Sequence, residues 1–414
     1  MGNTKRDYEH RVAQQHEGKI SEGLSDSALM VRMVAERVYV DGVGPSMDTP
    51  SVNYFLGSVA KGSPSRQHHP SSPSAVWPMV RRSLTTAHFV RDMKAIVCER
   101  YGAPEQLQLC DMPAPVPKDR QVLVRVHATT VNDYDWSMVI GRPRIYRLFF
   151  GLLRPRRPIP GMELAGKVVA LGPNATRWCE GDAVYGDTSN GGLGTFAELV
   201  AVPEDELRRI PPDLTFVAAS ALPHALELAY QAMVDIGKLK DGERVLINGA
   251  GGGVGTFALQ LAKRQGCTVW GVDTGEKLKA MTAMGFDRVI DYKQQDFTQL
   301  GERFDLVVDP KTKRSARELA RALTPTGRYV TVGGDPGRLI ALLFARWLGR
   351  RNMHILMLKS NKNLDTLAPL LSSGALKPVI DGPYDFDELP RLIRRFGEGF
   401  HTGKVVVRVA AEGA

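Results

Sequence analysis

Residues 245–263 read VLINGAGGGVGTFALQLAK, and this stretch decides the fold. An apolar run ends at Asn248, a cluster of glycines follows, and a helical pattern starts at Gly255. Small residues allow a tight turn between a strand and a helix, and the unpaired N–H groups at the start of a helix attract phosphate. The order of strand, glycine turn and helix therefore predicts a dinucleotide-binding Rossmann unit.

The glycine turn fits the pattern G-x-G-x-x-G, with alanine in place of the first glycine. We expect the turn to bind the diphosphate of the cofactor. The residues assigned to the cofactor here are Ala250, Gly251, Gly252, Gly253, Val254 and Gly255, with Gly333 after a later strand. A tight turn that binds no ligand is the alternative interpretation.

The choice between NAD and NADP stays open in these residues. Asp273 ends the next predicted strand, 18 residues after Gly255. An acidic residue there accepts hydrogen bonds from an unmodified ribose and repels a 2′-phosphate. Lys277 would instead pair with such a phosphate, or it would lie solvated in the first turn of a helix.

Strand and helix patterns alternate after Pro211-Pro212, which predicts parallel βαβ units. The expected strands are 244–248, 268–273, 288–292, 304–309 and 328–332, and the expected helices are 255–265, 276–284 and 316–323. The preceding region has short β-branched runs separated by proline and glycine, which predicts a compact all-β unit. Its expected strands are 94–99, 121–130, 166–171, 182–185 and 197–202, and a helix at 388–396 and a strand at 404–409 end the chain.

The composition is that of a globular protein, with 43% apolar and 24% charged residues. No apolar run approaches the roughly 18 residues of a membrane span, so we expect no transmembrane segment and a cytoplasmic location. The net charge of +9 comes without a basic run interleaved with aromatic residues, so we expect no nucleic-acid partner. The four cysteines form no CxxC motif and are expected to be reduced. Residues 1–92 contain Ser/Pro-rich stretches and are expected to form a poorly ordered extension.

Several further motifs follow one another in the order found in one known family. They are residues 93–97 (MKAIV), 160–166 (PGMELAG), 181–186 (GDAVYG), 191–198 (GGLGTFAE), 237–249 (GKLKDGERVLING), 289–292 (VIDY) and 403–407 (GKVVV). With these motifs the chain from residue 93 to about residue 409 resembles the medium-chain dehydrogenase/reductase superfamily, in its zinc-independent quinone oxidoreductase branch.

The resemblance implies an α/β protein in which a GroES-like β domain is built from both ends of the chain. A Rossmann domain with a doubly wound parallel sheet is inserted into it. The implied division is an extension at 1–92, a GroES-like catalytic domain at 93–220 completed by 357–414, and a Rossmann domain at 221–356. The resemblance also implies that Lys277 and Tyr292 contact the adenosine phosphate, which favours NADP over NAD. Relatives are commonly dimers, so we expect a homodimer.

The resemblance further implies that the site holds no zinc. Metal-dependent relatives use a cysteine in the first loop and a His-Glu pair after the second, and the matching positions here carry Asp135 and Met162-Glu163. A tetrahedral zinc site without its thiolate and its imidazole is unfavourable. The four histidines after residue 92 lack ligand-like spacing, and we expect packing or surface roles for them. They are His127, His224, His354 and His401.

Residues 131–136 (VNDYDW) resemble the loop of this family that faces the nicotinamide. Asn132 would donate its amide N–H to the substrate oxygen, orient the cofactor, or satisfy the local backbone. Asp135 is expected to fix the loop rather than transfer protons, because nothing evident in the sequence raises its pKa. Tyr134 and Tyr146 are candidate proton donors. Pro143 stands near the place where enoyl-thioester reductases of the family carry a tyrosine, which disfavours such a substrate.

Hydride transfer from the nicotinamide places negative charge on the oxygen of the acceptor. A metal ion normally stabilises that charge in alcohol–ketone chemistry, whereas a conjugated acceptor spreads it. The predicted function is therefore NAD(P)H-dependent reduction of a small quinone or α,β-unsaturated carbonyl. The alternatives are an alcohol or enoyl-thioester oxidoreductase of the same superfamily, and a low-turnover NADPH-binding protein similar to zeta-crystallin. The stretch 338–351 predicts an amphipathic helix that packs in the core or between subunits. The alternative is that it covers the cleft or contacts a lipid surface.

Overall fold

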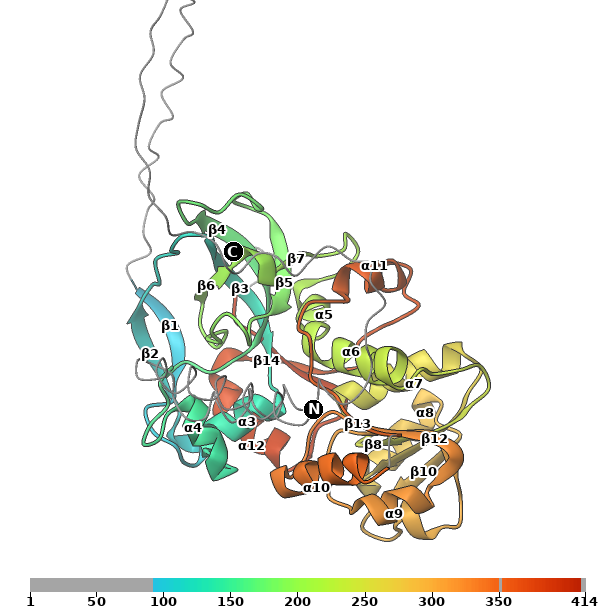
Figure 1. The fold of residues 1–414 in the computed structure, drawn as a ribbon. Coiled ribbons are helices and arrows are strands. Elements are labelled where there is room, and N and C mark those ends of the chain that lie inside the picture. Colours follow the sequence, from blue (N-terminus) through green and yellow to red (C-terminus); the bar gives the residue numbers. More distant parts are fainter. Residues whose placement is uncertain (1–91, 350–351, 411–414) are drawn as a thin grey trace, which may run out of the picture. The chain divides into compact units, whose positions relative to one another are not determined.

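The computed structural model describes residues 92–349 and 352–410. The predicted extension at 1–92 lies outside this part, apart from Asp92. Two larger sheets organise the described chain, one of six strands and one of seven (Figure 1). Within these residues, the structure has no helix whose length and apolarity would suffice to cross a membrane.

The six-stranded sheet is parallel throughout, as the alternation of strands and helices predicts. Its spatial order is β10 (Arg288–Asp291), β9 (Thr268–Asp273), β8 (Arg244–Asn248), β11 (Phe304–Asp309), β12 (Leu323–Thr331) and β13 (Met353–Ile355). The order runs outward in both directions from β8, which puts the end of this central strand at the point where ligands bind in such folds.

Helices cover both faces of this sheet (Figure 1). Side chains along β8 alternate between the faces, because successive residues of a strand point in opposite directions. Val245 and Ile247 join the core that contains Phe257 of α7 (Gly253–Arg264), and Leu246 joins the core that contains Leu319 of α9 (Ala316–Arg321). The remaining helices of this part are α6 (Pro223–Tyr230), α8 (Leu278–Met284), α10 (Pro336–Trp347) and α11 (Leu364–Ser372). The predicted doubly wound Rossmann architecture is confirmed.

The seven-stranded sheet combines both ends of the described chain. Its order is β14 (Ile380–Asp385), β15 (Lys404–Arg408), β3 (Gln121–Thr130), β4 (Glu163–Leu171), β5 (Ala183–Asp187) and β7 (Arg208–Arg209), and β6 (Leu199–Pro203) also pairs with β3. β1 (Asp92–Val97) and β2 (Gln108–Pro113) form a separate antiparallel pair. The GroES-like fold that the motifs imply is confirmed, and β15 lies between β14 and β3 of this sheet.

The helices of this second part are α3 (Asp133–Ile140), α4 (Arg147–Phe150), α5 (Phe216–Ser220) and α12 (Leu389–Gly397). Leu389, Leu392 and Ile393 of α12 pack with Val405 and Val407 of β15. This packing fixes β15 beside the loop that precedes α3.

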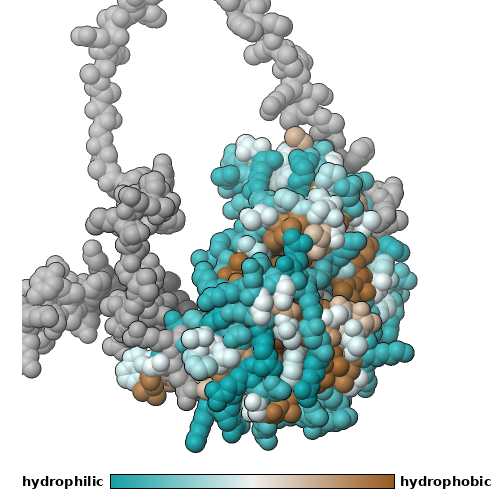
Figure 2. Space-filling model, turned by 90° about the vertical axis from the view of Figure 1, so that its right-hand side faces the viewer, coloured by the Kyte–Doolittle hydropathy of each residue, from teal (hydrophilic) through white to brown (hydrophobic). Residues whose placement is uncertain are grey.

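The amphipathic helix predicted at 338–351 forms as α10, but its apolar side does not fill the core. Leu342 is buried, whereas Phe344 and Trp347 are 62% and 75% exposed. Figure 2 shows, on one face of the molecule, apolar residues in separate groups between hydrophilic ones. The core-packing interpretation of this helix is therefore wrong for most of its apolar residues.

Candidate functional site

The glycine turn joins β8 to α7 and has the tight geometry that the sequence predicts. Gly249 has a φ of 71°, a conformation that favours glycine. A Cβ on Gly255 would lie 2.4 Å from the carbonyl oxygen of Ala250, so only glycine lets the helix approach the strand this closely. A Cβ on Gly252 would meet nothing nearer than 3.4 Å. The first N–H groups of a helix lack partners within it, and the start of α7 at this turn suits a diphosphate.

Asp273 and Lys277 meet at the edge of the glycine turn. Asp273 accepts hydrogen bonds from the backbone N–H of Gly251, at 2.9 Å, and of Thr274, at 2.8 Å. Lys277 Nζ lies 3.2 Å from Asp273 Oδ1, and both side chains are buried. The sequence presented these residues as competing ligands of the ribose, but the structure joins them in one ion pair. Tyr292 is half exposed, and its N–H donates to the carbonyl of Asp273.

Gly333 lies on the other side of the glycine turn, after β12. A Cβ on Gly333 would lie 3.3 Å from the carbonyl oxygen of Pro310, and the ring of Pro310 lies 3.1 Å from the Cβ position of Gly249. The turn after β11 thus separates Gly333 from the glycine turn. Asn248 and Lys311 are held in this region by hydrogen bonds to buried Asp309.

The end of the chain completes the glycine turn. The N–H of Gly403 donates to the carbonyl of Gly251 at 2.7 Å, and Gly403 forms a parallel bridge with Gly252. The stem of Lys404 lies 3.3 Å from the Cβ position of Gly253. Sequence reasoning used the motif at 403–407 only as a family marker and missed this contact.

His401 faces the same turn, with Nε2 3.8 Å from the Cβ position of Gly252. The ring stacks on Phe396 and is buried, and Nδ1 has no hydrogen-bond partner within the part of the chain that the structure describes. Burial and the nearby cations, first Lys277 and Lys311, hold the pKa of His401 well below its usual value. A neutral ring among cations favours an anionic ligand here. His401 therefore packs, as expected, but it also lies where it could contact such a ligand.

Asn132 is the N-cap of α3, and residues 133–136 of the predicted loop form the first turn of this helix. Asn132 N–H donates to Asp135 Oδ2 at 2.8 Å, and Gly161 N–H donates to Asp135 Oδ1 at 3.0 Å. Both carboxylate oxygens therefore accept backbone hydrogen bonds, and Asp135 fixes the local backbone conformation. Burial raises the pKa of Asp135 to about 7 despite these hydrogen bonds. The assumption that nothing raises this pKa was wrong, because complete burial is not visible in the local sequence.

Glu163 is the centre of a buried polar network below this loop. Its side chain accepts hydrogen bonds from Asn132 Nδ2, at 2.8 Å, and from Thr130 Oγ1, and it pairs with the ammonium of Lys404. Lys404 also donates to Asn132 Oδ1. Asn132 Nδ2 has a second acceptor in Thr130 Oγ1, at 3.3 Å. Every hydrogen-bonding atom of the Asn132 amide is thus engaged by protein, which suits an orienting role better than donation to a substrate.

The positions matched to the zinc ligands of metal-dependent relatives are part of these contacts. The carboxylates of Asp135 and Glu163 are engaged as described, and Met162 lies in an apolar cluster with Met138 and Leu193. In residues 92–349 and 352–410, no three or more His, Cys, Asp or Glu side chains are grouped so that they could hold a metal ion.

Tyr134 borders the same apolar cluster. Its ring packs edge-on against Phe150, with centroids 4.8 Å apart, and Tyr146 also packs edge-on against Phe150. Burial, followed by the charge of Asp135, raises the pKa of Tyr134 to about 12. We call Tyr134, Met138, Phe150, Met162 and Leu193 the apolar cluster below.

His224, expected to have a packing or surface role, contacts this network. Its N–H donates to Glu163 Oε1 at 2.7 Å, and its Nδ1 lies 2.9 Å from Asp187 Oδ2. His224 directly follows Pro223, the first residue of α6. The N–H groups at a helix start lack partners within the helix, and sequence reasoning did not use this signal.

Glu227, one turn further along α6, is a buried carboxyl with a measurable consequence. Its Oε1 accepts a hydrogen bond from the N–H of Asn363 at 2.6 Å, and burial raises its pKa to about 7 from 4.5. The proton that the folded state retains stabilises it below about pH 4.5, and this contribution is lost as the pH rises through 7. Because of Glu227, the free energy of unfolding of the wild type should fall by about 3 kcal/mol between pH 4.5 and pH 7, and Glu227→Gln should lack this fall. Urea unfolding of both proteins across this pH range measures the difference. The same pH dependence of unfolding free energy in both proteins would contradict the prediction.

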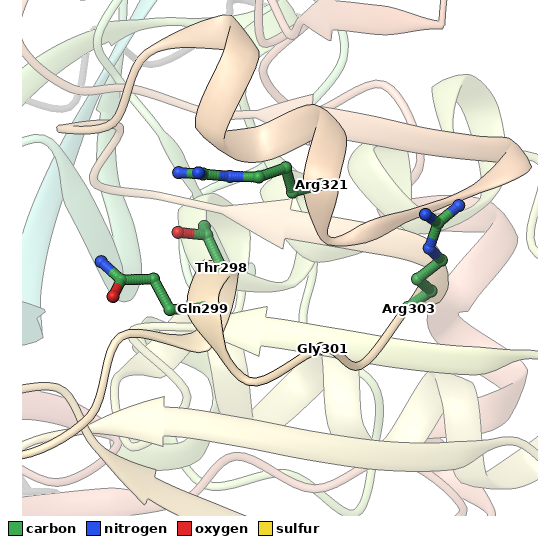
Figure 3. Close-up of a pocket in the computed structure, with 5 residues that line it drawn as sticks. All are labelled: Thr298, Gln299, Gly301, Arg303 and Arg321. Atoms are coloured by element: carbon green, nitrogen blue, oxygen red, sulfur yellow. The ribbon is translucent and has the colours of Figure 1, made fainter.

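A surface depression lies elsewhere, between α9 and the short turn η6 (Phe297–Gln299). It is lined by Thr298, Gln299, Gly301, Arg303 and Arg321 (Figure 3). None of the residues assigned to the cofactor or to catalysis lines it.

Comparisons with known proteins agree with this arrangement. Residues 118–212 match the alcohol dehydrogenase GroES-like domain family, and residues 284–407 match the zinc-binding dehydrogenase family. The chain is 31% identical over 334 residues to 2-methylene-furan-3-one reductase of Solanum lycopersicum, covering 78% of this chain and 81% of that protein. It is 30% identical, with the same coverage, to a chloroplastic NADPH-dependent alkenal/one oxidoreductase of Arabidopsis thaliana.

A solved structure, the quinone oxidoreductase from Coxiella burnetii, superimposes with a TM-score of 0.69 at 27% identity. It covers 77% of this chain and all of that one. The glycine turn, the two sheets and these relatives lead to one assignment: the chain belongs to the medium-chain dehydrogenase/reductase superfamily, in its quinone oxidoreductase-like branch.

Proposed function

We propose that this chain is an oxidoreductase that uses NADPH to reduce a small conjugated carbonyl compound or quinone. The observation that carries the proposal is that two consecutive residues, Gly403 and Lys404, contact both the glycine turn and the buried polar network. Gly403 bonds to the glycine turn, and Lys404 reaches the network of Glu163 and Asn132. The names of the similar reductases and oxidoreductases support the same substrate class.

The residues around the glycine turn fit a dinucleotide. The open approach at Gly252, the buried cation Lys277 and the Nδ1 of His401, which has no partner among the described residues, suit a phosphate-bearing ligand. When bound, the nicotinamide supplies a hydride. The chain positions the ring through the turn at Gly252 and through the Asn132 loop. The apolar cluster beside that loop excludes water, which strengthens the electrostatic effect of fixed polar groups.

Lys277 is expected to select NADPH over NADH. Its ammonium offsets the charge of Asp273, which would otherwise repel a 2′-phosphate. In Lys277→Ala the phosphate loses a cation and faces an unpaired carboxylate, so we expect a dissociation constant for NADPH about tenfold higher, with a smaller change for NADH. Fluorescence titration with both coenzymes measures the change. Equal weakening of both would contradict the assignment of Lys277 to the phosphate.

We also propose that the reaction needs no zinc, because the carboxylates at the matched positions hold backbone and the ammonium of Lys404. The experiment is an assay of the purified chain with NADPH and NADH against an enone, a quinone, an alcohol and an enoyl-thioester, together with its metal content. NADPH oxidation by enone or quinone in metal-free protein is the expected result. Stoichiometric zinc in active protein would overturn the metal-free assignment, and coenzyme binding without turnover would overturn the assignment as an enzyme.

The domain division and the assembly are proposals as well. We propose a GroES-like domain at 93–220, completed from the end of the chain, and a Rossmann domain that starts at 221. Leu364, Leu367 and Leu371 of α11 share a core with β8, which supports a later return to the GroES-like domain than residue 357. A homodimer is proposed from the exposed apolar side of α10, and sedimentation of the purified chain tests it.

The cytoplasmic location stays a prediction. The Arabidopsis relative is named as chloroplastic, so imaging of the tagged full-length chain in its own cells is the measurement that decides the compartment.

A further inference from the structure

His224 is held at two points on the wall of the proposed active site. Its backbone N–H is fixed by Glu163, and its Nδ1 faces the carboxylate of Asp187 at 2.9 Å. Asp187 is fully buried, and its Oδ1 accepts a hydrogen bond from Ser189 N–H at 2.8 Å. The Asn361 side chain accepts a hydrogen bond from the backbone N–H of Asp187 and donates one to its carbonyl oxygen. The carboxylate is therefore preorganised to orient the imidazole.

The charge of Asp187 fixes which nitrogen of His224 carries hydrogen. Burial acts to raise the pKa of Asp187, but the hydrogen bonds from His224 and Ser189 outweigh it and hold the pKa below its usual value. An ionised carboxylate only accepts hydrogen bonds, so Nδ1 of His224 must donate.

The other edge of the ring is available. The side chain of His224 is 21% exposed while that of Asp187 is not exposed at all, and Nε2 has no hydrogen-bond partner among the residues that the structure describes. Because Nδ1 points to the buried carboxylate, Nε2 lies at the more accessible edge of the ring.

The residues next to His224 and Asp187 connect this pair to the two parts of the proposed site. Its neighbour Ala225 lies 3.3 Å from the Cβ position of Gly253, at the start of α7. Next to Asp187, Thr188 N–H donates to the carbonyl of Met162 at 2.7 Å, which ties this segment to the apolar cluster. The start of α6, which carries His224, thus contacts the coenzyme turn, and the segment that carries Asp187 contacts the apolar cluster that we assign to the substrate.

We propose that His224, oriented by Asp187, is the acid that protonates the α-carbon of a conjugated ketone or aldehyde. The inference rests on the proposed function. Hydride addition to the β-carbon moves the electrons of the C=C bond to the oxygen and gives an enolate, while NADPH becomes NADP⁺. The N–H bond at Nε2 of the imidazolium breaks, and its proton forms the new C–H bond at the α-carbon. Neutral His224 keeps Nδ1–H on Asp187 and regains its proton from water.

Other groups near the site are already committed. Both oxygens of Asp135 accept backbone hydrogen bonds, and Lys404 is held by Glu163 and Asn132. Burial raises the pKa of Tyr134 to about 12. His224 is a nearby group with a proton-transfer atom that the protein leaves unused.

The test compares two acceptors in His224→Gln and Asp187→Asn, with His354→Gln in β13 as the control. A hydroquinone anion takes its proton on oxygen from water without help, whereas carbon protonation of an enolate is slow. With 2-methylcyclohex-2-enone, kcat should fall about 10²-fold in His224→Gln and less in Asp187→Asn. With 1,4-benzoquinone, kcat should change less than about threefold, and the control should match the wild type on both.

The product gives a second readout, which does not depend on rate. The wild type should deliver one configuration at the α-carbon of 2-methylcyclohexanone, and His224→Gln should give a mixture because water protonates either face. Imidazole should restore part of the enone activity of His224→Ala. An equal loss on both acceptors, or an unchanged product configuration, would overturn the proposal. A wild-type chain that reduces quinones but not enones also refutes it, and one inactive with both refutes the proposed function itself.

Discussion

Gly255→Ala is expected to weaken NADPH binding about a hundredfold, which corresponds to about 2.7 kcal/mol. The added Cβ would lie 2.4 Å from the carbonyl oxygen, 2.5 Å from Cα and 2.6 Å from the carbonyl carbon of Ala250. All three are backbone atoms, so α7 must move away from β8 as a unit. That movement displaces the N–H groups that the diphosphate needs.

Fluorescence titration with NADPH measures the effect, and Gly337→Ala is the matched control. A Cβ on Gly337 would meet only a side-chain oxygen of Asp335, at 3.2 Å. The control should bind coenzyme as the wild type does. Binding by Gly255→Ala within threefold of the wild type would show that the turn is not the diphosphate site.

Lys404→Met is expected to lower the free energy of unfolding by about 3–5 kcal/mol and to abolish most turnover. The side chains of Lys404 and Glu163 are 5% and 0% exposed, so the substitution leaves a carboxylate buried without its cation. It also releases the Asn132 amide, whose oxygen Lys404 holds. Stability and positioning of the loop therefore fail together.

Urea unfolding of the coenzyme-free protein measures the stability change. Lys404→Met combined with Glu163→Gln removes the buried charge and should recover part of the loss. Lys362→Met is the control, because its pair with Asp235 is exposed, at 49% and 32%, and such pairs contribute about 1 kcal/mol or less. A change in Lys404→Met no larger than in this control would mean that the buried pair does not stabilise the fold.

Four strands could be predicted residue by residue. The bounds of β3, β8, β9 and β11 coincide with the predicted ones, because each is a compact run of β-branched residues between turn residues. The prediction failed where the local pattern is weak. α11 contains Pro369, β13 has three residues, and β14 contains Gly382 and Pro383, and none of the three was predicted.

The candidate site divides in the same way. The glycine turn and the Asn132 loop are contiguous motifs, so sequence reasoning could find them. Other contacts of the site join residues that are far apart in the sequence. Lys404 lies 272 positions from Asn132, and Asp187 lies 37 positions from His224. Their meeting depends on how the strands pair in space, and no spacing rule along the chain encodes it.

The hydrogen bond from Gly403 to Gly251 connects the segment at β15 to the glycine turn, while Lys404 of the same segment contacts Glu163 and Asn132. A chain truncated before residue 403 would therefore lose contacts at the glycine turn and at this network together. The Rossmann segment expressed alone would likewise lack the backbone hydrogen bond to Gly251. The two parts of this protein thus depend on each other for function, even though each has its own sheet.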